Sequence, residues 1–348
     1  MDTVELQASS VAATRTPCKA AILGPVLAAL AYPFLLQAFH GAVSSSDGAL
    51  SAAVVALATA CLLGALATPL FGLAVAWRLS RTDHPSRFAL RARRLAYAGV
   101  AAPPMFVFAG VTLGLLGAPV SDTALWIAGW LAALVYGWSA GDGAIPAAAP
   151  TVARLRFAHG VSAALLAVFV LFHLSNHLTG LLGPAVHTRV MEIGRTVYRS
   201  AAIEPVFVGF LLFQVASGLR LAQRWSVPRA DSYRAVQVGS GVYLAAYVIT
   251  HLNSALVSAR TVHGIETDWD WASGAPNGLI LDAWNIRLLP HYAFGAFFAL
   301  AHMTTGLRQV LLAHGMSEAK ANRIWRAGLA ASGAVAATIV GALVGLRV

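Results

Sequence analysis

The sequence predicts an all-α, polytopic membrane protein with about nine transmembrane helices. The chain has 348 residues, of which 58% are hydrophobic and only 11% are charged, whereas soluble proteins carry about 25% charged residues. Apolar runs of about 20 residues, the length that crosses a bilayer as a helix, recur along the chain. The positive charges lie in short segments between these runs, which is typical of membrane proteins. Two cysteines are too few for a disulfide scaffold.

The nine apolar segments span approximately 21–40, 50–77, 95–117, 122–139, 157–182, 203–223, 235–258, 289–312 and 325–346. The second segment is longer than one crossing needs, which predicts a tilted helix. Pro103 and Pro104 lie inside the third segment and predict a kink or a break there. The connection 259–288 is acidic and carries three tryptophans, so we expect it at the outer membrane interface.

The basic residues predict how the chain is oriented. In the nine-span arrangement, 18 of the 24 Lys and Arg residues fall on one side, which favours an N-terminus inside and a C-terminus outside. The net charge of +10 follows from these connections, so we expect no nucleic-acid partner. Residues 1–20 show neither a clear cleavage site nor an Arg-rich transit pattern. This favours the bacterial cytoplasmic membrane, with a mitochondrial membrane as the alternative.

The second half of the chain contains an internal repeat. His173 follows Arg156 by 17 residues, and His251 follows Arg234 by the same spacing. The next apolar segment of each unit ends in Gly-Leu-Arg, at Arg220 and at Arg308. The apolar segments 157–182 and 203–223 are therefore repeated as the segments 235–258 and 289–312. The four segments together predict a four-helix bundle. The predicted divisions are a cytoplasmic N-terminal segment 1–20, a four-helix membrane scaffold 21–150 that is a candidate degenerate copy, the bundle 151–313 and a C-terminal transmembrane helix 314–348.

Histidines at membrane depth are costly and usually have a defined partner. His173 and His251 fall at matching depth in segments that lie diagonally opposite in a four-helix bundle, so they are candidate axial ligands of one haem iron. Asn176 and Asn253 are candidate acceptors for the other ring nitrogens. His177 shares a helix face with His173.

Two alternatives stay open at this point. His159 and His173 lie nearly on one helix face, as do His291 and His302. These four residues would hold two stacked haems, an outer one between His173 and His291 and an inner one between His159 and His302. In the other alternative, the histidines only form hydrogen bonds between helices, and for His302, which corresponds to Gln214 in the repeat, this structural role is favoured. No zinc motif, cysteine redox pair, nucleophile motif or phosphate loop is visible, so no catalytic residue is predicted.

With these residues, the second half resembles the membrane-anchor cytochrome b subunits of succinate dehydrogenase and fumarate reductase. The resemblance covers 154–310 and implies one haem b near the outer face, held by His173 and His251, with His177, Arg195 and Arg199 at its propionates. It also implies a degenerate second site, in which Gln214 stands opposite His302. The function implied is electron transport between quinone and a partner, with a soluble redox partner on the inner face.

Fungal mitochondrial membrane proteins of the same superfamily, which act in lipid homeostasis and organelle contacts, resemble the chain in three further elements. These elements read His173-Leu-Ser-Asn-His177, Arg195-Thr-Val-Tyr198 and Glu204-Pro205. That resemblance implies an alternative function, a non-catalytic membrane scaffold or adaptor with structural histidines. The long N-terminal half departs from the respiratory anchor pattern. In both cases we expect membrane lipids as partners.

Overall fold

The computed structural model describes residues 20–44, 51–145 and 151–348. Within these ranges the regular elements are helices, and the only β-pairing is a single bridge between Ser86 and Ala144. This confirms the predicted all-α class. Arg15 and Lys19 of the predicted N-terminal segment lie outside the described residues.

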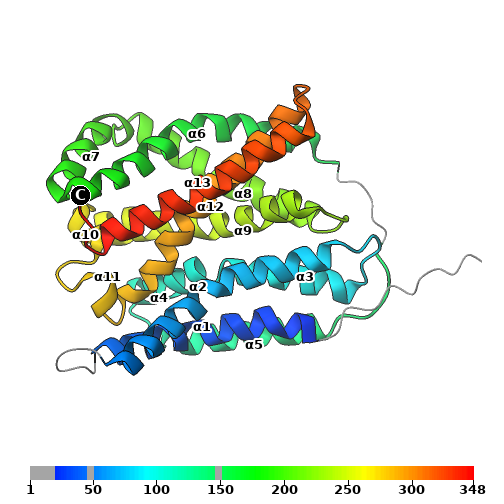
Figure 1. Ribbon diagram of the computed structural model, residues 1–348, viewed down its shortest axis with the longest axis horizontal. Helices are drawn as coiled ribbons and strands as arrows, with labels where there is room; N and C mark the ends of the chain where they lie inside the picture. The colour runs from blue at the N-terminus through cyan, green and yellow to red at the C-terminus, as the bar shows by residue number, and fades with distance from the viewer. Residues whose placement is uncertain (1–19, 45–50, 146–150) are drawn as a thin grey trace, which may run out of the picture.

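The N-terminal half forms one layer of the molecule and the C-terminal half packs on it (Figure 1). The first layer holds α1 (Ala20–Ser44), α2 (Ala52–Ser80), α3 (Arg87–Val100), α4 (Ala102–Leu115) and α5 (Asp122–Trp138). The second part holds α6 (Ala153–Thr179), α7 (Pro184–Tyr198), α8 (Ile203–Trp225), α9 (Ser232–Leu252), α10 (Trp269–Ser273), α11 (Gly278–Leu281), α12 (Leu288–Ala313) and α13 (Glu318–Leu343). A π-helix, Asn253–Val262, continues α9 directly.

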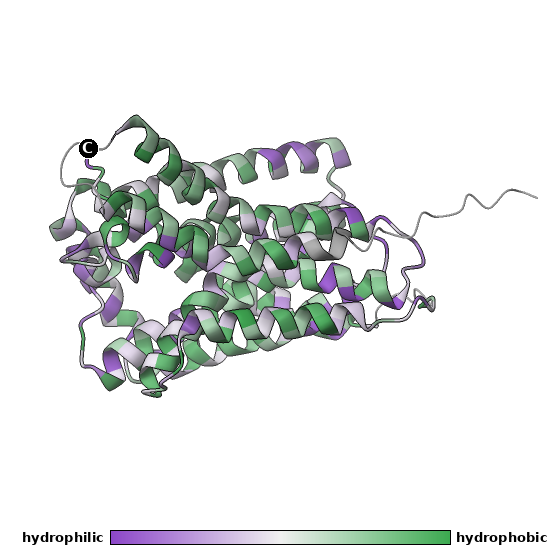
Figure 2. Ribbon diagram, turned by 90° about the horizontal axis from the view of Figure 1, so that it is seen from below, coloured by the Kyte–Doolittle hydropathy of each residue, from purple (hydrophilic) through white to green (hydrophobic). Residues whose placement is uncertain are grey.

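Six helices in the described residues are long and apolar enough to cross a membrane, so the chain is an integral membrane protein. They are Gly24–Ser44, Ala52–Ser80, Ala153–Leu182, Ile203–Trp225, Ser232–Val262 and Glu318–Leu343. The pair α3 and α4 makes a seventh span if the two helices are counted together. Hydrophobic residues follow most of the length of the helices, and hydrophilic residues gather near their ends (Figure 2).

The break predicted at Pro103 and Pro104 is confirmed. The two prolines occupy the first turn of α4, where a missing N–H group costs little. α3 ends at Val100, and α4 leaves it at an angle of 66°. The hydroxyl of Thr250 on α9 is shared between the carbonyl of Ala246 on its own helix, at 2.7 Å, and the carbonyl of Pro104, at 3.0 Å, so the bent span contacts the C-terminal half beside its break.

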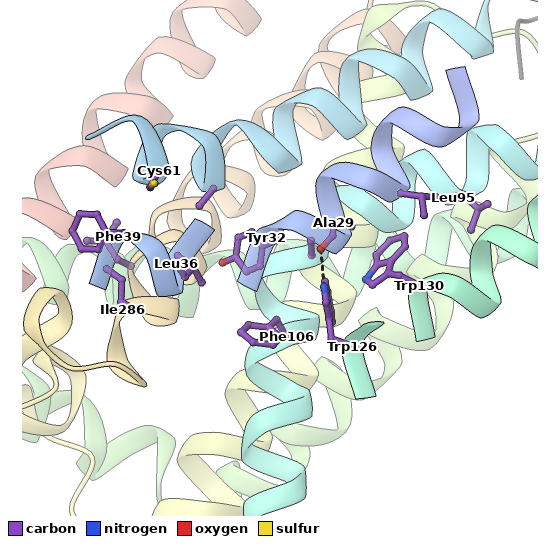
Figure 3. Packing of buried hydrophobic residues seen from close by; sticks show 14 of the residues in the cluster. Ala29, Tyr32, Leu36, Phe39, Cys61, Leu95, Phe106, Trp126, Trp130 and Ile286 are labelled. Carbon is purple, nitrogen blue, oxygen red and sulfur yellow. Dashed lines mark hydrogen bonds between the residues drawn. The ribbon is translucent and has the colours of Figure 1, made fainter. Parts of the chain in front are cut away.

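Aromatic side chains form the core of the N-terminal layer (Figure 3). Tyr32, Phe106, Trp126 and Trp130 follow one another edge to face, with ring centroids 6.0, 5.4 and 5.6 Å apart. The indole N–H of Trp126 donates to the carbonyl of Ala29 at 2.7 Å. Aromatic packing of this kind stabilises the contact of α1 with α4 and α5.

A buried arginine joins the two parts of the molecule. Arg93 on α3 is fully buried, and its guanidinium donates to the carbonyls of Leu79, Ser226, Val227 and Pro228 at 2.5, 2.7, 3.2 and 3.0 Å. Three of these carbonyls belong to the turn between α8 and α9. Arg93 therefore satisfies helix-end carbonyls that would otherwise lack a donor.

A second arginine fixes the opposite end of the molecule. Arg287, which precedes α12, forms an ion pair with Asp122 in the first turn of α5. Its guanidinium also lies over the rings of Phe106 and Trp284, at 4.5 and 4.9 Å from their centroids. The connection 259–288 thus packs into the protein through Arg287 and does not only cover its surface.

The helices α6, α8, α9 and α12 surround a common interior. Going round the ring, α6 packs on α8, α8 on α9, and α9 on α12, while α13 packs on α12 and reaches α6. α6 and α9 therefore occupy opposite corners. The turns α2–α3, α8–α9 and α12–α13 lie at one end of the molecule, whereas α7, α10 and the C-terminus lie at the other (Figure 1). We call these the α8–α9 end and the α7 end.

Candidate functional site

A cavity of about 1060 Å³ runs lengthwise through this ring of helices. Its walls are mainly apolar, which is typical of cofactor and ligand sites. The cationic residues and histidines that line it near its ends are Arg156, Arg234 and His314 toward the α8–α9 end and Arg195, Arg199 and Arg260 toward the α7 end. The C-terminal half therefore contains a long interior cavity.

The two candidate axial ligands meet in this cavity. His173 comes from α6 and His251 from α9, the helices at opposite corners, and both line the cavity. Their ring centroids lie 6.0 Å apart, with the ring planes at 68°. His251 is the second-last residue of α9, directly before the π-helix, an element that is frequent at functional sites.

A row of imidazoles extends from this pair toward the α7 end. The Nε2 atom of His177 lies 3.3 Å from that of His173, and His187 on α7 follows at 5.3 Å between ring centroids. His187 packs in turn on the indole of Trp269, 4.8 Å away. Sequence reasoning missed His187; the signal is its four-residue spacing from Met191, since both side chains are buried on one face of α7.

The charge state of His187 follows from its surroundings. Burial and the nearby guanidinium of Arg195 lower the pKa of His187 to about 4, so its ring is neutral at pH 7. The side-chain amide of Asn176 lies 3.3 Å from Nε2 of His187, and that of Asn253 donates to Thr112. We expected each asparagine to accept a hydrogen bond from the ring of a candidate axial ligand. Neither does so, because α7 and α4 present these competing partners.

The basic residues expected at the propionates already have partners. Arg195 forms an ion pair with Glu266 and donates to the carbonyl of Thr267 at 2.8 Å. Arg199 donates to the hydroxyl of Thr267 at 2.7 Å and lies 3.5 Å from Glu266. Both guanidiniums line the α7 end of the cavity, so they remain candidates for an anionic group there.

A further ion pair closes the wall of the cavity at the α7 end. Arg260 on the π-helix donates to both carboxylate oxygens of Glu204 on α8, at 2.5 and 3.3 Å. In the sequence, Glu204 stands out only as part of the Glu204-Pro205 element. Its role as a partner of Arg260 was not predicted, because the π-helix brings Arg260 to that side.

His291 does not belong to the same site. It is buried but is not among the residues that line the cavity. The ring of Tyr247 lies 4.5 Å from His291 and stacks on His251 at 5.8 Å, with an interplanar angle of 7°. The structure thus separates His291 from His173 and brings His251 to His173 instead.

Two more histidines line the cavity nearer the α8–α9 end. The Nδ1 atom of His159 on α6 lies 2.8 Å from Oγ of Ser217 on α8. The Nδ1 atom of His302 on α12 lies 2.9 Å from Oγ of Ser240 on α9. His302 thus has the interhelical hydrogen bond that the sequence favours. Gln214 does not reach His302; it donates to the carbonyl of His159 at 2.8 Å.

In the parts of the chain that the structure describes, no group of three or more His, Cys, Asp and Glu residues is arranged to hold a metal ion. A haem differs from such sites, because the protein supplies only its axial ligands. No protein-family model, curated protein or solved structure matches the chain. The resemblance to respiratory membrane anchors therefore stays a prediction from the residues named above.

Proposed function

We propose that this protein is a membrane b-type cytochrome, in which His173 and His251 hold one haem b. The protein would transfer electrons through this haem between quinone and a partner. The observation that carries the proposal is the approach of two imidazoles from opposite helices to 6.0 Å inside one cavity. Imidazole is a common axial ligand of haem iron, and both rings line the same cavity from opposite helices. The donor set therefore fits a bis-histidine iron.

Each part of the site has a role in this proposal. The haem supplies reversible one-electron transfer, and the protein tunes it through ligation and burial. The apolar cavity wall excludes water from the imidazole pair. Arg195, Arg199 and His177 lie on the α7 side of that pair and would contact the propionates. Each arginine would then bind both a propionate and Glu266, its present partner.

The proposal includes a nine-span topology with the N-terminus inside. Adding α5, α12 and the bent pair α3–α4 to the six apolar helices gives nine crossings. The turns α2–α3, α8–α9 and α12–α13 lie at one end and carry most of the described basic residues (Figure 1), which supports placing this end in the cytoplasm. A soluble redox partner of the succinate dehydrogenase or fumarate reductase type would dock at this end. The protein itself would lie in the bacterial cytoplasmic membrane.

A visible spectrum tests the proposal. Purified protein, expressed with adequate haem supply, is expected to show a sharp α-band in the dithionite-reduced minus air-oxidised difference spectrum. His173→Ala and His251→Ala should each remove the spectrum of this site, while the exposed His263→Ala should leave it unchanged. Colourless wild-type protein, or a spectrum that both variants retain in full, would contradict the assignment.

A second function, a non-catalytic membrane scaffold or adaptor in lipid homeostasis, is favoured by the contacts that the candidate site residues already make. Arg195 and Arg199 are already bound to the segment 266–267, and His173 and His177 contact each other. In this case the histidines only stabilise helix packing. The protein would then be colourless, and His173→Ala would lower its thermal stability without any spectral change.

A further inference from the structure

Two arginines at the α8–α9 end of the cavity have no anionic partner among the described residues. Arg156 on α6 and Arg234 on α9 both line this end. Within the described part of the chain, neither guanidinium forms an ion pair or a hydrogen bond. Asp231 is close in sequence, but it caps α9 by accepting from the backbone N–H of Arg234 at 2.7 Å and forms no ion pair with the side chain.

The surroundings of these two side chains add to their positive charge. α6 and α9 both begin at this end (Figure 1), and Arg156 and Arg234 lie in their first turns. The helix dipole is positive there and favours anions over cations. The charge of Arg156 also acts on Arg234, so the two guanidiniums repel each other. An anion between them would remove this repulsion and interact with both helix ends.

Trp225 indicates the depth of this arginine pair in the membrane. The guanidinium of Arg234 lies 4.1 Å from the ring centroid of Trp225, the last residue of α8. Trp225 also lines the cavity. Tryptophan and arginine at the ends of membrane-spanning helices are typical of the level of the lipid headgroups. A phospholipid carries its phosphate at this level, and a guanidinium donates two parallel hydrogen bonds to such a group.

The cavity opens toward the bilayer beside the arginine pair. Phe157 on α6 and Val310 on α12 line it, although they are 75% and 52% exposed. α6 packs on α8 and has little contact with α12. α13 covers the gap between α6 and α12 toward the α7 end, where Ile339 and Leu343 line the cavity. At the α8–α9 end an apolar chain can therefore pass between α6 and α12.

The cavity is long enough for an acyl chain that does not reach His173. Arg156 precedes His173 by 17 residues on α6, which corresponds to about 25 Å along the helix. One leaflet contributes about 15 Å, half of the hydrocarbon core of about 30 Å. An acyl chain that starts at Arg156 would therefore end roughly 10 Å before the imidazole pair. Leu166, Val215 and Leu244 provide an apolar wall along this length.

We propose that the half of the cavity nearer the α8–α9 end binds one anionic phospholipid. Its phosphate lies between Arg156 and Arg234, one acyl chain extends into the cavity, and the other passes between α6 and α12 into the bilayer. The lipid links α6 to α9, which occupy opposite corners of the ring. This inference goes beyond the proposed function and does not depend on it, because neither candidate axial ligand takes part.

Thermal stability in defined lipids tests the inference. The detergent-purified protein is titrated with phosphatidylglycerol, with phosphatidylcholine of the same acyl chains, and with inorganic phosphate. We expect a saturable rise in melting temperature with phosphatidylglycerol alone, and one retained lipid per chain in native mass spectrometry. An equal rise with phosphatidylcholine would overturn the role of the arginine pair. An equal rise with inorganic phosphate would identify a free anion and overturn the lipid.

Two double variants compare the arginine pair with a matched pair. Arg156→Gln combined with Arg234→Gln removes both guanidiniums. Arg154→Gln combined with Arg224→Gln removes two exposed charges near the same end that do not line the cavity. The first double variant should bind phosphatidylglycerol about tenfold more weakly or worse, and the second should bind it as wild type does. Equal affinities would overturn the proposal. Arg156→Gln alone, at an exposed position, gives the same comparison if the first double variant does not fold.

Gly160→Leu tests whether the acyl chain lies inside the cavity. Gly160 lines the cavity one turn beyond Arg156, and a Cβ atom there would meet nothing within 4 Å. Leucine at this position narrows the space for the acyl chain and keeps the arginine pair, so phosphatidylglycerol should bind more weakly. Ala158→Leu is the control, because Ala158 is exposed and does not line the cavity. Unchanged binding in Gly160→Leu would place the lipid on the outer surface and overturn the assignment. None of these measurements uses haem, so they remain decisive whether or not the protein is a cytochrome.

Discussion

Arg93 gives the most direct test of how the two halves hold together. In Arg93→Lys the charge is kept, but the planar fork that reaches four carbonyls is lost. A lysine has three donors on one nitrogen, so we expect at least one of the four carbonyls to lose its partner. A hydrogen bond to a charged group contributes about 1.5–3 kcal/mol, so one lost bond predicts a loss of about 1.5–3 kcal/mol in the free energy of unfolding.

The loss can be measured as a shift in melting temperature. For domains of 150–250 residues, 1 kcal/mol corresponds to about 2–4 °C, so detergent-purified Arg93→Lys should melt about 3–12 °C below wild type. Arg78→Lys is the control, since Arg78 is an exposed arginine on the neighbouring α2, and it should melt as wild type does. A shift of Arg93→Lys no larger than that of the control would refute the reasoning that the fork geometry joins the halves.

Three further predictions follow from other contacts. Asp122→Asn leaves the buried guanidinium of Arg287 without its anion, and since breaking a buried pair costs about 3–5 kcal/mol, a calorimetric scan should show a clear drop in melting temperature. His187 has a folded-state pKa of about 4, below its usual 6.5, because of burial and Arg195. The unfolded chain therefore binds this proton first, and stability should fall as pH decreases from about 6.5 to 4, less steeply in His187→Gln; equal slopes would contradict this cause. Glu204→Gln weakens the ion pair between α8 and the π-helix and should increase hydrogen exchange in 253–262, whereas unchanged protection would show that the pair does not hold this segment.

Periodicity and proline positions predicted much of the fold because they act locally. Pro103 and Pro104 lack N–H groups, so a break in the span follows from their chemistry alone. The approach of His173 to His251 also follows from equal spacing in two repeated segments. These features depend on each helix by itself or on the order of helices around a bundle.

Other features depend on which faces meet, and the sequence alone does not specify them. Ser217 and Ser240 have no special spacing; they become significant only because α8 and α9 turn them toward histidines of α6 and α12. The helix α7 lies in a segment that the apolar pattern leaves as a connection, so His187 was missed. The partners of Arg195 were missed for the same reason, because they lie about 70 residues further along the chain.

The hydrogen bond from Thr250 to Pro104 defines the rotational setting of α9. Thr250 directly precedes His251, and successive residues of a helix point about 100° apart. A hydroxyl held by the bent span therefore fixes the direction in which the next side chain leaves the helix. α9 also packs on α4, α8 and α12, so this contact adds to those that keep His251 facing His173. The N-terminal half thus helps to orient one imidazole of the pair. A fragment that begins at residue 151 would lack the contact with Pro104.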